Sequence, residues 1–106
     1  MIRRMRLHPA AGEEFVDAAA WYLSIGNALG RDFQQELEAA MGLLMQSPIP
    51  AVPHPRLPAA LGLRRVILRR FPYDLVFIER QNEIHIIALA HHARRPGYWR
   101  SRLGQR

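Results

Sequence analysis

The sequence predicts a single α+β domain, in which an N-terminal strand and a helical hairpin precede a three-stranded antiparallel meander and a short C-terminal tail. Apolar residues recur at helical spacing in the first half of the chain and form short strand-like runs in the second half. Five prolines within residues 48–58 separate the two halves. The length of 106 residues suits one small core, so we expect one domain over 1–106.

The first half of the chain is predicted to form one strand and two helices. Residues 2–7 mix apolar residues with three Arg and suit a short strand, which ends at His8-Pro9. Apolar residues at steps of three and four predict helices over 9–25 and 28–46. Because the link between them is so short, the two helices are expected to form an antiparallel hairpin.

The second half is predicted to form a loop and three strands. The proline-rich residues 47–62 are expected to be a loop with extended character. Strands are predicted over 63–70, 73–78 and 84–90, with Phe71-Pro72 and a polar turn as connections. Connections of this length make consecutive strands antiparallel neighbours.

The last strand is expected to be apolar on both faces. Strict alternation places Ile84, Ile86, Ala88 and Ala90 on one face, and His85, Ile87, Leu89 and His91 on the other. The helical hairpin covers only one sheet face. The second face therefore either binds a partner beside a basic rim, or is covered by residues 47–62 or by the tail.

Several functional classes are disfavoured by composition. The chain has no Cys, which excludes disulfides and thiolate zinc sites and fits a cytoplasmic protein. It has no apolar run of roughly 18 residues, and no apolar stretch follows the basic N-terminus as in a signal peptide. The five His lack metal-ligand spacing, and there is no phosphate-binding glycine loop, so we expect no metal and no cofactor.

The charge is strongly segregated along the chain. The net charge is +6, and all 15 basic residues are Arg. A genome rich in G and C would explain Arg in place of Lys. It would not explain why acids concentrate between Glu13 and Glu38 while Arg residues cluster after residue 63. The clustering favours a basic face for phosphates, carboxylates or an acidic partner.

Two runs of residues resemble the ParE/RelE toxins of bacterial type II toxin–antitoxin systems. Residues 69–77 (RRFPYDLVF) are similar to the strand turn R-R-F-P-Y-x-h-x-Y of these toxins, where h is apolar. Residues 84–99 (IHIIALAHHARRPGYW) resemble the ending I-x-I-x-A-V-A-H-x-x-R-x-P-x-Y-W of the ParE branch. The helical half resembles the family's hairpin in element order.

The resemblance implies a toxin that is neutralised by a cognate antitoxin with an acidic C-terminal segment, in a cytoplasmic hetero-oligomer. ParE-like members inhibit DNA gyrase by binding, whereas RelE-like members are ribosome-dependent mRNA endonucleases. RelE-like sites use several Lys and an Arg at the position of Asp74 here. A carboxylate there would repel the scissile phosphate, so we expect the gyrase mechanism and regard the endonuclease as the alternative, with Arg65 or Arg69 as possible substitutes for the missing cation.

Candidate site residues follow from both mechanisms. If the chain is an RNase, the residues with suitable acid–base groups are His91, Arg94 and Tyr98. Residues expected to bind the antitoxin or the target are Arg65, Arg69, Arg70, Arg94, Arg95, Tyr98 and Arg102. Structural roles compete with these: His91 would bond the tail, and Trp99 would join the core. A plain nucleic-acid-binding module and a toxin that no longer kills are further alternatives.

Overall fold

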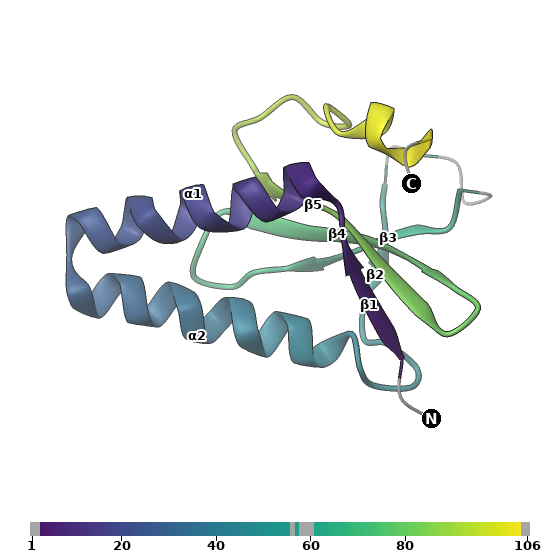
Figure 1. Ribbon diagram of the computed structural model, residues 1–106, viewed down its shortest axis with the longest axis horizontal. Coiled ribbons are helices and arrows are strands. Elements are labelled where there is room, and N and C mark those ends of the chain that lie inside the picture. The colour runs from purple at the N-terminus through teal and green to yellow at the C-terminus, as the bar shows by residue number, and fades with distance from the viewer. Residues whose placement is uncertain (1–2, 56, 58–60, 105–106) are drawn as a thin grey trace.

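The computed structural model describes residues 3–55, 57 and 61–104 and has an α+β fold, as predicted. Its elements are β1 (Arg4–Leu7), α1 (Pro9–Ile25), α2 (Asn27–Leu43), β2 (Val52–Pro53), β3 (Leu63–Ile67), β4 (Tyr73–Arg80), β5 (Glu83–His91) and the 3-10 helix η2 (Arg100–Gly104). Figure 1 shows α1 and α2 as an antiparallel hairpin beside the sheet, with the C-terminal tail in yellow above β5.

The sheet has five strands in the order β1-β5-β4-β3-β2. The predicted meander of β3, β4 and β5 is confirmed, and its pairs are antiparallel. Each edge gains one short strand: β1 pairs with β5 in parallel, and β2 pairs with β3. The segment expected to be only a loop thus contributes Val52–Pro53, where proline is tolerated because β2 lies at an edge.

Element boundaries differ from prediction mainly at the C-terminal ends. The first helix spans the predicted residues, whereas α2 ends at Leu43 rather than at residue 46, and β3 ends at Ile67 rather than at residue 70. The hairpin is tighter than expected, because Gly26 alone links the helices. A Cβ at Gly30 would lie 3.1 Å from the Leu23 backbone, so glycine permits the close approach of α2 to α1.

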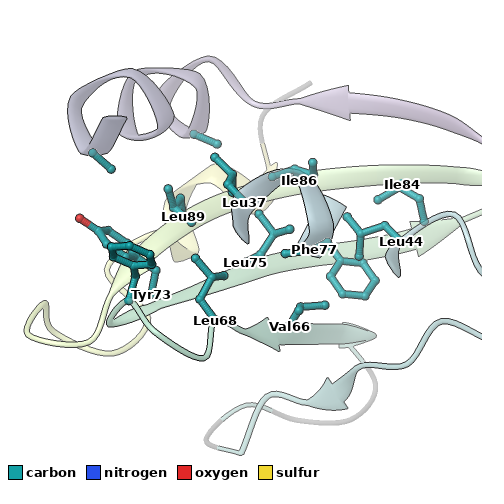
Figure 2. Packing of buried hydrophobic residues seen from close by; sticks show 14 of the residues in the cluster. Leu37, Leu44, Val66, Leu68, Tyr73, Leu75, Phe77, Ile84, Ile86 and Leu89 are labelled. Atoms are coloured by element: carbon teal, nitrogen blue, oxygen red, sulfur yellow. The ribbon is translucent and has the colours of Figure 1, made fainter. Parts of the chain in front are cut away.

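The main core lies between the hairpin and one sheet face, called here the helix face. Tyr22 and Phe33 stack with ring centroids 4.9 Å apart, and both rings contact Phe71 and Tyr73. Figure 2 shows Leu37 of α2 and Leu44, which directly follows α2, among the side chains of β4 and β5. Burial within this cluster raises the pKa of Tyr73 to about 12.

The opposite face, called here the tail face, is covered by the chain itself. Its buried cluster contains Leu63, Val76, Ile78, Ile87, Ala88 and Trp99, and partly buried Leu57, Leu61, Ala90, Tyr98 and Leu103 pack against it. Trp99 is only 1% exposed, which confirms that it belongs to the core. The idea of a bare apolar sheet face is therefore wrong, and the alternative that the loop and the tail fold over it is correct.

The predicted alternation of side chains along β5 is also wrong after Ile86. The register of β4 and β5 shifts between Val76 and Phe77, which pair with Ala88 and Ile86. Ile87 is the extra residue of this bulge, so the side chains that follow change faces. Ala88 consequently packs on the tail face and Leu89 on the helix face. Among the described residues, no helix has the length and apolarity needed to cross a membrane.

Candidate functional site

A pocket of about 380 Å³ opens on the tail face, where the ends of the central strands meet the tail. Its floor comes from β3, β4 and β5, and its wall from residues 92–99 and the loop before β3. The charged and imidazole side chains that line it are His54, Arg65, Asp74, His91, His92, Arg94 and Arg95. The β4–β5 bulge lies directly beside this pocket, at Val76.

Asp74 is the buried carboxylate of this pocket, and it is held from two sides. It is 7% exposed, its Oδ2 accepts a hydrogen bond from Arg65 Nη1 at 2.7 Å, and its Oδ1 lies 2.8 Å from His92 Nε2. The register of β3 and β4 places Arg65 opposite Val76 and Ile67 opposite Asp74, so Arg65 and Asp74 are diagonal neighbours on the tail face. These partners neutralise the carboxylate that was expected to repel phosphate.

The Arg65 guanidinium is incompletely bonded. Its Nε is buried and makes no hydrogen bond within the described part of the chain, although Nη1 is bound to Asp74. A guanidinium has five N–H donors, and the two oxygens of Asp74 are already bound by Arg65 and His92. Asp74 therefore does not satisfy all the hydrogen-bond donors of the Arg65 guanidinium.

A second carboxylate, that of the partly buried Glu14 of α1, anchors the tail. Arg102 donates to both of its oxygens at 2.8 and 3.1 Å, and Tyr98 donates its hydroxyl to Oε2. Leu89 N–H of β5 donates to Oε1 at 3.1 Å, while Arg94 Nη1 lies 3.5 Å from Oε2. Burial and the hydrogen bond to Glu14 together raise the pKa of Tyr98, and the hydrogen bonds that Arg102 donates to Glu14 raise the pKa of Arg102.

The position of Glu14 has a simple structural cause. The strand β1 ends at Leu7, opposite Ile86, so β5 has no strand partner on that side beyond this point. Glu14 accepts from Leu89 N–H there, and Arg102 Nη1 donates to the carbonyl of Ile87 at 3.0 Å. The ion pair thus continues the backbone bonding that β1 would otherwise supply.

Several predicted site residues make internal contacts. Tyr98 and Arg102 are bound by Glu14, and the Arg94 guanidinium lies 3.8 Å from the centroid of the Tyr98 ring. Arg70 pairs with Asp32 at 3.1 Å, and its backbone N–H donates to Glu36. That these four residues also bind the antitoxin or the target stays a prediction.

His91 has the structural contact expected of it, because its Nδ1 accepts from Ala93 N–H at 2.9 Å. It also packs edge-on against Tyr73, with ring centroids 5.0 Å apart. His91, Arg94 and Tyr98 nevertheless line one pocket. The pairing of His92 with Asp74 was not predicted, since nothing in the local sequence shows that these two residues meet.

Arg69, Arg95 and Arg100 are exposed and make no ion pair among the described residues. Arg95 also lines a second hollow of about 290 Å³, which shares His54, Pro96 and Gly97 with the pocket and adds Leu57 and Arg100. The two hollows are therefore adjacent along the tail, and together they are called here the tail groove. Among the described residues, no three His, Asp or Glu side chains gather as a metal site would require.

Comparison with known proteins agrees with this architecture. Residues 5–96 match the family model described as the ParE toxin of the type II toxin–antitoxin system parDE. No curated protein matches the chain. A solved structure titled "Chromosomal ParDE TA system from P. aeruginosa" is similar, with a TM-score of 0.68, 20% identity, and coverage of 85% of this chain and 96% of that chain. At that identity the structural match shows the fold alone.

Proposed function

Because the chain belongs to the ParE toxin family of type II toxin–antitoxin systems, we propose that it inhibits growth by binding a cellular target, and that this target is DNA gyrase. The observation that supports binding rather than chemistry is the environment of Asp74. At the position where RelE-like toxins have a catalytic Arg, this chain has Asp74. Its carboxylate is bound by Arg65 and His92. A phosphodiester placed there would meet an ion-paired carboxylate instead of a free cation.

The three residues that an RNase would need are also engaged elsewhere. His91 accepts from the backbone of the tail, and the Tyr98 hydroxyl donates to Glu14. The raised pKa of Tyr98 further disfavours the phenolate that a general base would require.

The test is a gyrase supercoiling assay run beside a translation assay with purified protein. We expect inhibition of supercoiling and intact transcripts. Cleaved transcripts in the translating extract, lost on Tyr98→Phe or His91→Ala, would instead establish the endonuclease. That alternative is favoured by one observation, namely that His91, Arg94 and Tyr98 line one pocket.

Neutralisation by an acidic antitoxin is the second part of the proposal, and the resulting hetero-oligomer would be cytoplasmic. Six of the nine acids lie within residues 9–46, whereas 14 of the 15 Arg lie outside this range. The sheet and the tail therefore present the basic side of the molecule. We expect Arg65, Arg69, Arg94 and Arg95 to supply much of the contact with the antitoxin.

The measurement for this part is the affinity of the cognate antitoxin as a function of salt concentration. Affinity should fall steeply as salt rises, and Arg69→Ala combined with Arg94→Ala should reduce both affinity and the salt slope. The matched control is Arg4→Ala with Arg80→Ala, which removes two exposed cations from the other end of the sheet. A flat salt dependence in the unmodified chain would contradict the proposal.

A further inference from the structure

The tail groove combines apolar walls with unneutralised cations. Ile67, Val76 and Ala90 form apolar parts of the pocket, and Ile67 remains 47% exposed at the end of β3. Arg95 lies between the two hollows, and Arg100 lies in the second. Neither has an ion-pair partner among the described residues, so the groove has apolar surface and positive charge that the chain does not itself satisfy.

The charge of the pocket is positive even though Asp74 lies in it. The pocket is lined by one carboxylate, that of Asp74, and by three guanidinium groups, those of Arg65, Arg94 and Arg95. The contact of Arg94 with Glu14 is long, at 3.5 Å. An anionic group that enters the groove would therefore be stabilised by an ion pair with at least one guanidinium, that of Arg95, which has no ion-pair partner among the described residues. Such charge-assisted contacts favour carboxylates and phosphates alike.

The aromatic residues of the groove favour a peptide over a nucleic acid. Single-stranded nucleic acids usually bind through bases that stack on open aromatic faces. Trp99 is buried, and the Arg94 guanidinium covers the Tyr98 ring at 3.8 Å. The pocket instead offers the aliphatic side chain of Ile67, which suits an apolar amino-acid side chain.

We propose that the tail groove binds an extended peptide in which an apolar side chain is flanked by acidic ones. The apolar residue packs on Ile67 and Ala90 in the pocket, and the acidic residues pair with Arg95 and Arg100 along the tail. The identification of this peptide with the acidic segment of the antitoxin rests on the proposed function. The site itself does not, and it is testable without the antitoxin.

The experiment measures binding of three capped peptides to the purified full chain by calorimetry. The probe is Ac-Glu-Leu-Glu-Leu-Glu-NH2, the neutral analogue replaces each Glu by Gln, and the polar analogue replaces each Leu by Ser. We expect each analogue to bind about tenfold more weakly or worse, because one loses the ion pairs and the other the apolar contact. Equal binding of the neutral analogue would overturn the proposal.

Two pairs of variants locate the site. Arg95→Gln with Arg100→Gln should weaken the acidic peptide about tenfold or more, whereas Arg4→Gln with Arg80→Gln, which removes the same charge from exposed positions elsewhere, should not. Ile67→Ser tests the apolar contact at a half-exposed position. Equal losses in both double variants would mean nonspecific attraction to a basic protein and would also overturn the proposal.

A single-stranded hexauridylate serves as the competing ligand. If it binds more tightly than the acidic peptide and loses affinity on Arg95→Gln with Arg100→Gln, the groove is a nucleic-acid site and the peptide proposal fails. Failure of the proposed function gives a different result from failure of the groove proposal. In that case the unmodified chain binds the acidic peptide but does not inhibit supercoiling by gyrase. Conversely, an unmodified chain that inhibits supercoiling and is neutralised by its antitoxin, but binds none of the three peptides, would refute the groove alone.

Discussion

Glu14 and Asp74 are two carboxylates with the same kind of partner and different surroundings, and Glu14 is partly buried whereas Asp74 is buried. Glu14 is bound by Arg102, Tyr98 and a backbone N–H, and its contacts span 75 to 88 residues of sequence. Asp74 is bound by Arg65 and His92 within a pocket that is open to solvent.

The difference separates a structural cluster from a candidate binding site. The Glu14–Arg102 pair has side chains 14% and 13% exposed and satisfies backbone groups of β5. At Asp74, the partner His92 is 45% exposed, and Arg65 has a donor without an acceptor. Glu14 accepts a backbone hydrogen bond that β1 does not supply to β5, so its role is to stabilise the fold. Asp74 lies beside Arg65, whose donors it does not fully satisfy, so its role is to set the charge of the pocket.

The largest effect is expected for Glu14→Gln. The substitution leaves the partly buried Arg102 without its counter-ion, which should cost about 3 kcal/mol of unfolding free energy, the lower end of the range for buried pairs. Urea denaturation followed by tryptophan fluorescence measures the loss in a Trp21→Phe background, where Trp99 alone reports the tail that should detach first. The neighbouring exposed Glu13→Gln is the control, with an expected change within about 0.5 kcal/mol. Equal losses in the two variants would remove the distinction between Glu14 and an ordinary surface acid.

A smaller effect is expected for Asp74→Asn. Arg65 and His92 are more exposed than Arg102, so water can solvate them, and the unfolding free energy should fall by about 2 kcal/mol. The same substitution removes the negative charge from the pocket, so binding of the acidic peptide should tighten. A loss as large as that of Glu14→Gln, with unchanged peptide affinity, would make Asp74 a second structural carboxylate and erase the comparison.

The smallest effect is expected for Tyr98→Phe, and it should depend on pH. Glu14 keeps its other donors in this variant, so the loss at neutral pH is about 1 kcal/mol. Because folding raises the pKa of Tyr98, its protonated hydroxyl stabilises the fold below pH of about 10, and this stabilisation is lost as pH rises toward the folded pKa.

Urea unfolding from neutral pH to pH of about 11 measures this dependence. Stability should decline less steeply in alkali for Tyr98→Phe than for the unmodified chain. The decline should not vanish, since the pKa of Tyr73 is also raised, to about 12. Tyr73→Phe is the matched comparison, and superimposable pH profiles for Tyr98→Phe and the unmodified chain would show that the Glu14 contact does not matter.

The spacing of apolar residues was sufficient to predict the helices and strands, but not to predict which sheet face each side chain of a strand lies on. The boundaries of α1 and the order of β3, β4 and β5 followed from spacing, because helices and strands repeat over distances within one element. The faces of Ala88 and Leu89 did not, since a bulge at Ile87 changes the alternation. A bulge depends on the neighbouring strand and leaves no local pattern in this sequence.

The candidate site shows the same limit. Arg65, Arg94, Arg95 and Tyr98 were chosen for their charge and hydrogen-bonding chemistry, and all four line the pocket. Glu14 escaped notice because it is one acid among several on α1 and its partners are far along the chain. Arg70 and Arg102 were chosen on the same grounds as the others, yet the fold gives each an internal acidic partner.

The fold class, the family and the segregation of charge could be predicted from the sequence, because each depends on residue order or composition. The structure was needed to show that the tail covers the second sheet face, that Glu14 pairs with Arg102, and that Asp74 pairs with Arg65. These features could not be predicted because burial and ion pairing depend on which side chains meet across elements. Strand register and the path of the tail determine those meetings, and neither can be read from any one segment of the sequence.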